Sequence, residues 1–183
     1  MCKALRRENE KALTILIRST RGAARPEIDM PNPDLTLDDL AIGDSWPGGP
    51  IIVAEADIIR FAREFDPQPM HTDPKAAAHG RFGGLIASGW HVASLVMRDF
   101  VDTAPFGATP MLGLRVDELQ WLYPVRPGDT LQIRREIVAV ARSRSKPDRG
   151  TISMKMTVTN QDGAVVLSFL NLIQMPARSG AGG

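Results

Sequence analysis

The chain has 183 residues, of which 43% are hydrophobic and 23% charged, and this is the size and composition of one globular domain. A formal net charge of +1 argues against a nucleic-acid-binding protein, and no apolar run is long enough to span a membrane. Cys2 is the only cysteine, so no intramolecular disulfide can form, and we expect a reducing, cytoplasmic location.

The N-terminal segment carries the basic excess of the sequence. Seven of the 22 basic residues but only two of the 21 acidic residues lie in residues 1–25. Its arginines leave an organelle transit peptide as an alternative, although its two glutamates argue against one. We therefore expect a poorly ordered basic extension over residues 1–35, one domain over residues 36–177 and a flexible tail over residues 178–183.

The first half of the domain predicts a loop, a strand and a helix. Residues 22–50 are rich in proline, glycine and aspartate and are typical of a loop. The β-branched run PIIVAEA, over residues 50–56, predicts a short strand. Apolar residues at helical spacing then predict a helix over residues 55–65, which must end there because Pro67 disfavours helical geometry in the residue before it.

The segment FDPQPMHTDP, residues 65–74, predicts a rigid loop between two apolar segments. Each of its three prolines removes a backbone donor and restricts the chain. Asp73 is expected to cap a short helical turn in DPKAAAH. Ser88 is expected to cap the strongest helix of the chain, over residues 88–104.

Beyond Pro110 the sequence predicts strands. Four segments of alternating character are separated by turn signals, of which NQDG is a hairpin signal. We expect an antiparallel meander here, and an α+β domain with one long helix packed on a curved sheet. The four segments span residues 112–125, 129–142, 150–163 and 164–175.

Three motifs, in this order, resemble those of the MaoC-like acyl dehydratases, or (R)-specific enoyl-CoA hydratases. The motifs are DPQPMHTD, GLIASGWH and PVRPGDTL, which begin at residues 66, 84 and 124. The resemblance spans roughly residues 40–176 and implies a hot-dog fold, in which a curved antiparallel sheet wraps around one long helix. Gln68 and Ser88 stand where the family often has asparagine and histidine, which leaves the accepted acyl chain open.

A carboxylate and an imidazole on a proline-stiffened loop suit the activation of one water molecule. Asp66 and His71 are five residues apart, and a loop that folds back brings both side chains into one cleft. Gly89 begins the long helix, where free backbone N–H groups and the helix dipole favour negative charge. The resemblance implies that Asp66 and His71 are catalytic, that the Gly89 N–H forms the oxyanion hole, and that Gly84, Ile86, Ser88 and Trp90 contact substrate.

Other conspicuous residues have simpler explanations. We expect His91 to be packed and hydrogen-bonded inside the long helix, and His79 to be solvated or to lie at the cleft rim. Trp90 and Trp121 are expected to pack rather than to contact a cofactor. Three scattered histidines show no metal-ligand spacing, and no nucleotide-binding glycine motif is present, so no cofactor is expected beyond the coenzyme A of the substrate.

The basic loop SRSKPDRG has two interpretations. Arg142, Arg144 and Lys146 have the charge to contact coenzyme A phosphates, but an exposed hairpin tip explains the same composition.

The sequence favours reversible hydration of a trans-2-enoyl-CoA, with an acyl-CoA as ligand and no nucleic-acid or membrane partner. The resemblance also implies a homodimer or higher homo-oligomer. A hot-dog thioesterase is an alternative, but it needs a carboxylate near the start of the long helix, and none occurs before Asp99. A non-catalytic acyl-binding subunit is a second alternative, against which the presence of both Asp66 and His71 argues. Acyl chain length and the choice between coenzyme A and an acyl-carrier protein stay open.

Overall fold

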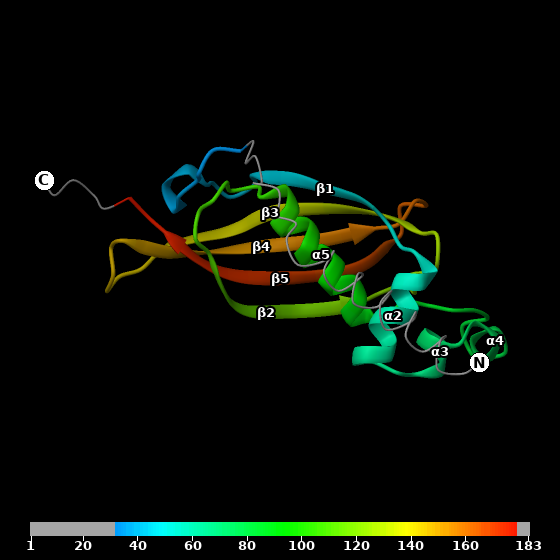
Figure 1. Cartoon of the computed structure of the whole chain (residues 1–183). Helices are drawn as coiled ribbons and strands as arrows, with labels where there is room; N and C mark the ends of the chain where they lie inside the picture. The colour runs from blue at the N-terminus through cyan, green and yellow to red at the C-terminus, as the bar shows by residue number, and fades with distance from the viewer. Residues whose placement is uncertain (1–31, 179–183) are drawn as a thin grey trace, which may run out of the picture.

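The computed structural model describes residues 32–178, and residues 1–31 and 179–183 lie outside it. One five-stranded antiparallel sheet, in the order β1-β3-β4-β5-β2, packs its inner face against the long helix α5 (Figure 1). The strands are β1 (Ser45–Ile52), β2 (Leu112–Trp121), β3 (Thr130–Arg142), β4 (Arg149–Thr159) and β5 (Val165–Pro176). The helices are η1 (Leu37–Asp39), α2 (Glu55–Phe65), α3 (Pro69–Thr72), α4 (Pro74–Ala78) and α5 (Gly89–Thr103).

The expected α+β hot-dog architecture is confirmed. Helix α2 ends at Phe65, directly before the Asp66-Pro67 pair, and α4 is capped by the Asp73 side chain as predicted. Helix α5 buries Val92 and Val96 in the main core, which it shares with the inner faces of β3, β4 and β5. This burial holds the start of α5 at one end of the sheet.

The prediction of a four-strand meander was wrong for β2. Strands β3, β4 and β5 do follow one another, but β2 pairs with β5, with Leu112 opposite Gln174 and Trp121 opposite Leu167. Residues 122–129, which contain two prolines, carry the chain from β2 across the end of the sheet to β3. Strand β2 is therefore an edge strand, and β1 is the other edge.

Strand β1 lies earlier than the sequence predicted, at 45–52 instead of 50–56. Its two prolines are tolerated because an edge strand has one side without partners. A register shift between Gly48 and Ile51 marks an irregularity in this strand. A Cβ on Gly48 would lie 2.4 Å from the Arg135 guanidinium, so glycine makes room for that buried side chain.

Ordered contacts begin before residue 36, where the domain was expected to start. The Asn32 side chain donates to the carbonyls of Thr103 and Ala104 at 3.1 and 3.2 Å, and the Leu35 N–H donates to Phe106. Arg178, where the flexible tail was expected to begin, donates its backbone N–H to Asp38 at 2.7 Å. Residues 1–31 and 179–183 lie outside the described part of the chain. Between residues 32 and 178, no helix is long and apolar enough to cross a bilayer, and no group of three metal-ligating side chains occurs.

Candidate active site

A cleft of about 380 Å³ opens where α5 begins, between α3 and the chain that leaves β2. Most of its wall is apolar, and its polar groups gather at one side. Asp66, His71, Ser88 and Gly89 all line it, although Asp66 and Ser88 are 22 residues apart in sequence. The other lining residues are Phe82, Ile86, Ala87, Trp90, Val92, Trp121, Leu122, Tyr123, Pro124, Val125 and Val166.

His71 is carried on the single turn of α3, in a segment that the sequence predicted as loop. Pro69 occupies the first helical position, where its missing N–H costs nothing. His71 Nδ1 lies 2.8 Å from the Ile86 carbonyl oxygen, and the Ile86 N–H donates back to the Met70 carbonyl at 3.1 Å. The imidazole is 4% exposed, so two tethers to one neighbouring segment hold a buried ring in place.

Asp66 is the residue directly after α2, and both of its carboxylate oxygens accept hydrogen bonds. Gln68 Nε2 donates to Oδ1 at 2.8 Å, and Ser88 Oγ donates to Oδ2 at 2.7 Å. The bond from Gln68, and then that from Ser88, lower the pKa of Asp66 below its usual value, against the opposing effect of burial. Asp66 is therefore ionised at neutral pH, as a proton acceptor must be.

The Asp66 and His71 side chains lie side by side, close enough for one water molecule beside them to contact both. Asp66 Oδ2 lies 3.5 Å from His71 Nε2. A carbonyl oxygen cannot donate, so His71 Nδ1 carries a proton toward Ile86, and a ring with that proton alone presents Nε2 as an acceptor. Two acceptors side by side are satisfied by one water that donates to both. Such a water has its oxygen lone pairs free to attack.

Helix α5 begins with backbone donors that no group in the described chain satisfies. Ser88 stands at the N-cap as predicted, but its hydroxyl donates to Asp66 and makes no capping bond. The N–H groups of Gly89, Trp90 and His91 have no acceptor within residues 32–178. Because α5 has 15 residues, its dipole adds partial positive charge at this end. An oxygen that gains negative charge is stabilised here.

The structure assigns a different reason for glycine at position 89 than the sequence suggested. A Cβ at Gly89 would lie 2.4 Å from Trp121 Nε1 and 2.6 Å from Trp121 Cε2. The indole of Trp121 therefore fills the space beside the helix start. Glycine is needed at this position for the packing of Trp121.

Of the expected substrate contacts, Ile86, Ser88 and Trp90 line the cleft, and Gly84 does not. Gly84 instead faces the Arg126 guanidinium, which would lie 3.2 Å from a Cβ at that position. Trp90 and Trp121 form an edge-to-face pair at 5.2 Å but are 58% and 46% exposed. The two rings pack against each other, as expected, and both also line the cleft.

Arg142, Arg144 and Lys146 lie at the other end of the sheet, in and beside the β3–β4 hairpin. Figure 1 shows this hairpin at the left end and α2, α3 and α4 at the right. The 10 residues of β2 separate the two ends, which is roughly 30 Å of strand. Arg142 moreover forms an ion pair with Asp38. Within one chain, these three residues and the cleft do not meet.

The other histidines lie outside the polar side of the cleft. His91 is buried and stacks on Phe61 with ring centroids 4.9 Å apart, but its Nδ1 has no partner in the described chain. Burial lowers the pKa of His91, which keeps the ring neutral. His79, the residue after α4, is exposed, and its Nδ1 lies 2.9 Å from the Lys75 carbonyl oxygen.

Sequence reasoning missed the wall formed by Trp121, Leu122 and Tyr123. These residues directly precede the third motif, PVRPGDTL, and their aromatic content was the one local signal. Their place in the cleft depends on β2 pairing with β5, which no local pattern indicated.

Known proteins agree with this architecture. The family model described as MaoC like domain matches residues 41–160. An uncharacterised protein of Bacillus subtilis, YdeM, is 31% identical over 127 residues, which are 69% of this chain and 89% of that protein. The crystal structure of a MaoC-like dehydratase from Rhodospirillum rubrum is 40% identical, covers 79% of this chain and 98% of its own, and has a TM-score of 0.72.

A third likeness is one of fold. The (R)-hydratase PhaJ1 of Pseudomonas aeruginosa is 23% identical, covers 82% of this chain and 94% of its own, and has a TM-score of 0.60. Residues 41–160, which the family model matches, include all three motifs, the four strands β1, β2, β3 and β4, and the whole of α5. The chain therefore belongs to the MaoC-like family of dehydratases and hydratases.

Proposed function

We propose that the protein catalyses reversible hydration of a trans-2-enoyl thioester. The observation that carries this proposal is the facing pair of Asp66 and His71, set as two acceptors for one water. The water oxygen bonds to C3 of the substrate while one of the two side chains accepts a proton from it. The side chain that accepted this proton then delivers it to C2, which completes the addition, and the same groups act in reverse during dehydration.

The negative charge that builds on the thioester oxygen is stabilised at the start of α5. The Gly89 N–H has no other acceptor in the described chain and lies in the same cleft as Asp66 and His71. One donor of this kind typically lowers a barrier by roughly 3–4 kcal/mol. The mostly apolar remainder of the cleft suits an acyl chain.

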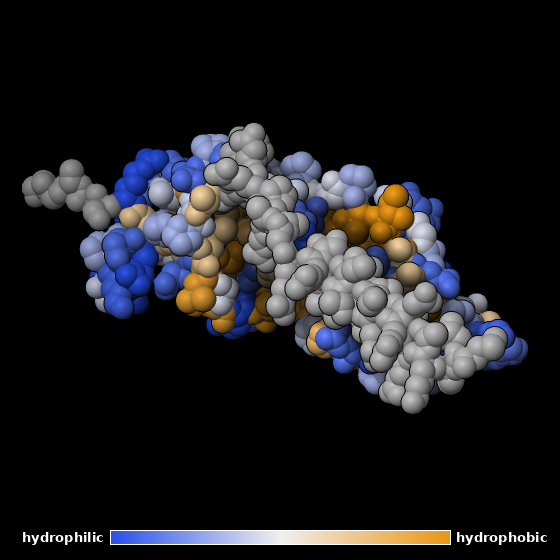
Figure 2. Space-filling view, in the orientation of Figure 1, coloured by the Kyte–Doolittle hydropathy of each residue, from blue (hydrophilic) through white to orange (hydrophobic). Residues whose placement is uncertain are grey.

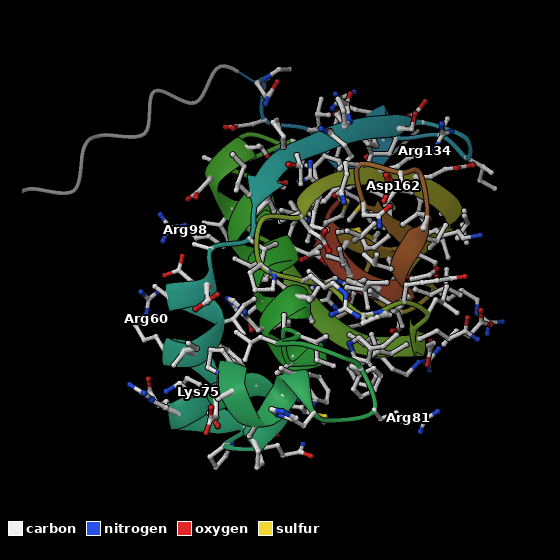
Figure 3. All side chains as sticks on the ribbon, turned by 90° about the vertical axis from the view of Figure 1, so that its right-hand side faces the viewer. Arg60, Lys75, Arg81, Arg98, Arg134 and Asp162 are labelled. Atoms are coloured by element: carbon white, nitrogen blue, oxygen red, sulfur yellow. The ribbon has the colours of Figure 1, made fainter. Side chains whose placement is uncertain are left out.

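The test is the loss of enoyl-thioester ultraviolet absorbance with crotonyl-CoA and a longer trans-2-enoyl-CoA. Asp66→Asn should lower kcat by about 1000-fold, because an amide cannot accept the proton from water. Asp162→Asn is a matched control. Asp162 is an exposed residue of the β4–β5 turn, and in Figure 3 it lies on the opposite side of the view from Lys75 of α4. Equal activity of the two variants would refute the assignment of Asp66.

Neither alternative finds comparable support in the described residues. On α5 itself, Asp99 is engaged by the buried Arg135 and is only 11% exposed, and Asp102 pairs with Arg98, so neither is free to act as a thioesterase carboxylate. A non-catalytic subunit would not need a buried His71 and a doubly hydrogen-bonded Asp66 in one cleft.

We place the phosphates of the substrate carrier near Arg81 and Arg126, in preference to the β3–β4 hairpin. Arg126 donates to the carbonyl of Phe82, a cleft residue, at 2.6 Å, and Arg81 lies 5.8 Å from the Phe82 ring. Neither arginine has a carboxylate partner within residues 32–178, and Arg81 projects away from the body of the molecule (Figure 3). Arg126→Ala should raise KM for an enoyl-CoA more than KM for the matching enoyl-pantetheine, which lacks phosphate. Equal increases would refute this placement.

We further propose a homodimer through the β2 edge and the neighbouring side of α5. Both present large exposed apolar side chains, and Figure 2 shows hydrophobic residues at the lower edge of the view, beside the start of β2. An unpaired strand edge with apolar neighbours is typical of an interface. Light scattering should give twice the mass of one chain, and a monomer would contradict the proposal. The exposed residues are Trp90, Met97, Val101, Leu112, Leu114, Val116 and Tyr123.

A further inference from the structure

The indole of Trp121 lies on the start of α5 in an orientation that leaves its N–H unused. A Cβ at Gly89 would be 2.4 Å from Nε1, 2.6 Å from Cε2 and 2.7 Å from Cδ1. These three nearly equal distances mean that the face of the indole, and not its edge, covers Gly89. The N–H lies in the plane of the ring, so it points across the helix end and not into it.

This N–H is a free donor on the wall of the cleft. Indole nitrogen donates and never accepts, and Nε1 has no hydrogen-bond acceptor within residues 32–178. The ring is held between the Gly89 backbone and the edge-to-face contact with Trp90, with centroids 5.2 Å apart. A donor fixed in this way does not have to be ordered when substrate binds.

The Trp121 N–H is close enough to the Gly89 N–H for both to reach one oxygen atom. The backbone nitrogen lies about 2.5 Å from the Cβ position of its own residue. Since Nε1 lies 2.4 Å from that position, the two nitrogens are at most about 4.9 Å apart. Two donors that each bond one oxygen at about 2.9 Å are separated by no more than about 5.8 Å.

We propose that Trp121 is a catalytic residue whose indole N–H is a second donor to the thioester oxygen, beside the Gly89 N–H. This inference rests on the proposed hydratase function. During addition of water, negative charge moves from the C2–C3 double bond to the thioester oxygen. Two fixed donors stabilise that charge more than one, and both bonds strengthen as the charge develops.

The test compares Trp121→Phe with Trp46→Phe in the full-length protein. Both substitutions remove an indole N–H and keep an aromatic ring. Trp46 lies in β1, in an edge-to-face contact with Phe106 in the core and outside the cleft. Trp121→Phe should lower kcat for crotonyl-CoA hydration by about 100-fold with little change in KM, because the bond is strongest in the transition state. Trp46→Phe should leave kcat unchanged.

A second readout does not depend on turnover. In an Asp66→Asn background, bound 2,4-hexadienoyl-CoA should absorb at longer wavelength than the free compound, because hydrogen bonds polarise its carbonyl. Adding Trp121→Phe should reduce this shift, and adding Trp46→Phe should not.

The outcomes separate this inference from the function on which it rests. An active wild type with equal kcat values and equal spectral shifts for the two tryptophan variants would overturn the role of Trp121 alone. Faster turnover by Trp121→Phe would also overturn it, since the ring would then be an obstacle. A wild type that neither hydrates enoyl-CoA nor binds the dienoyl probe would overturn both proposals.

Discussion

The two ends of helix α5 differ in how completely their polar groups are satisfied. At the C-terminal end, the Thr103 hydroxyl donates to the Asp99 carbonyl at 2.6 Å, and Asn32 supplies donors for the last carbonyls. The Asp99 side chain accepts from the Gly49 N–H at 2.9 Å and from the fully buried Arg135. At the N-terminal end, the Ser88 side chain turns away to Asp66, and the first backbone N–H groups find no acceptor in the described chain.

The two ends of α5 therefore have different roles: the C-terminal end anchors the helix, and the N-terminal end offers donors to a ligand. Buried polar groups are normally paired, so an end where donors stay free marks a place where a ligand completes the structure. The C-terminal end fixes α5 on β1 and β3, and the N-terminal end then presents its donors at a constant position. Substitutions at the two ends should therefore affect different observables.

The largest effect on stability is expected at the anchored end. Asp99→Ala leaves the Arg135 guanidinium buried without its carboxylate, and this should lower the free energy of unfolding by about 3 kcal/mol. The melting temperature should fall by about 10 °C in calorimetry. At a temperature where the variant is folded, its kcat should match that of the wild type.

Asp102→Ala is the matched control for Asp99→Ala. Asp102 pairs with Arg98 on the exposed side of the same helix, where an ion pair contributes little. Equal melting temperatures for the two variants would mean that the buried pair is not the anchor.

The largest effect on activity outside the Asp66–His71 pair is expected from Gly89→Ala. Its Cβ would enter the space of the Trp121 ring, so either the indole or the helix start must move. We expect kcat to fall by about 100-fold. The melting temperature should change less, because the Trp121 ring is 46% exposed and has room to move aside. Enoyl-CoA hydration and calorimetry together measure the two effects.

Gly113→Ala is a control for this glycine substitution, since nothing lies within 4 Å of a Cβ at that position of β2. In the double variant Gly89→Ala with Trp121→Ala the steric conflict is removed, so this variant should bind the dienoyl probe. A Gly89→Ala variant with wild-type kcat would show that activity does not depend on the close fit between the helix start and Trp121.

A smaller effect is expected from Ser88→Ala. The Ser88 hydrogen bond helps to lower the pKa of Asp66, so its loss should raise that pKa. Since the ionised carboxylate is the active form, the acid limb of the kcat/KM profile should move to higher pH. At the pH optimum, kcat should fall by about tenfold, which is the usual effect of losing one hydrogen bond to a charged group.

Ser94→Ala is a control for the hydroxyl loss, because Ser94 donates only to the Trp90 carbonyl within α5. An unchanged acid limb in Ser88→Ala would show that Asp66 does not set it. The lowered pKa of Asp66 also stabilises the fold above the pKa of the unfolded chain, and this contribution is lost as the pH falls through the folded-state pKa.

The sequence by itself determined the features that local chemistry dictates. Pro67 ended α2 at Phe65, Asp73 capped α4, and the NQDG turn joined β4 to β5. The three motifs in order also indicated the candidate site, since Asp66, His71 and Gly89 do line one cleft.

Only the tertiary structure decided which distant segments meet. Strand β2 pairs with β5, which brings Trp121 onto Gly89 and places Arg142 far from the cleft. The buried pair of Asp99 and Arg135 joins residues 36 positions apart in the chain. Such contacts leave no periodic signal in the sequence, because they depend on strand order and on the fit of side chains that approach only after the sheet has formed.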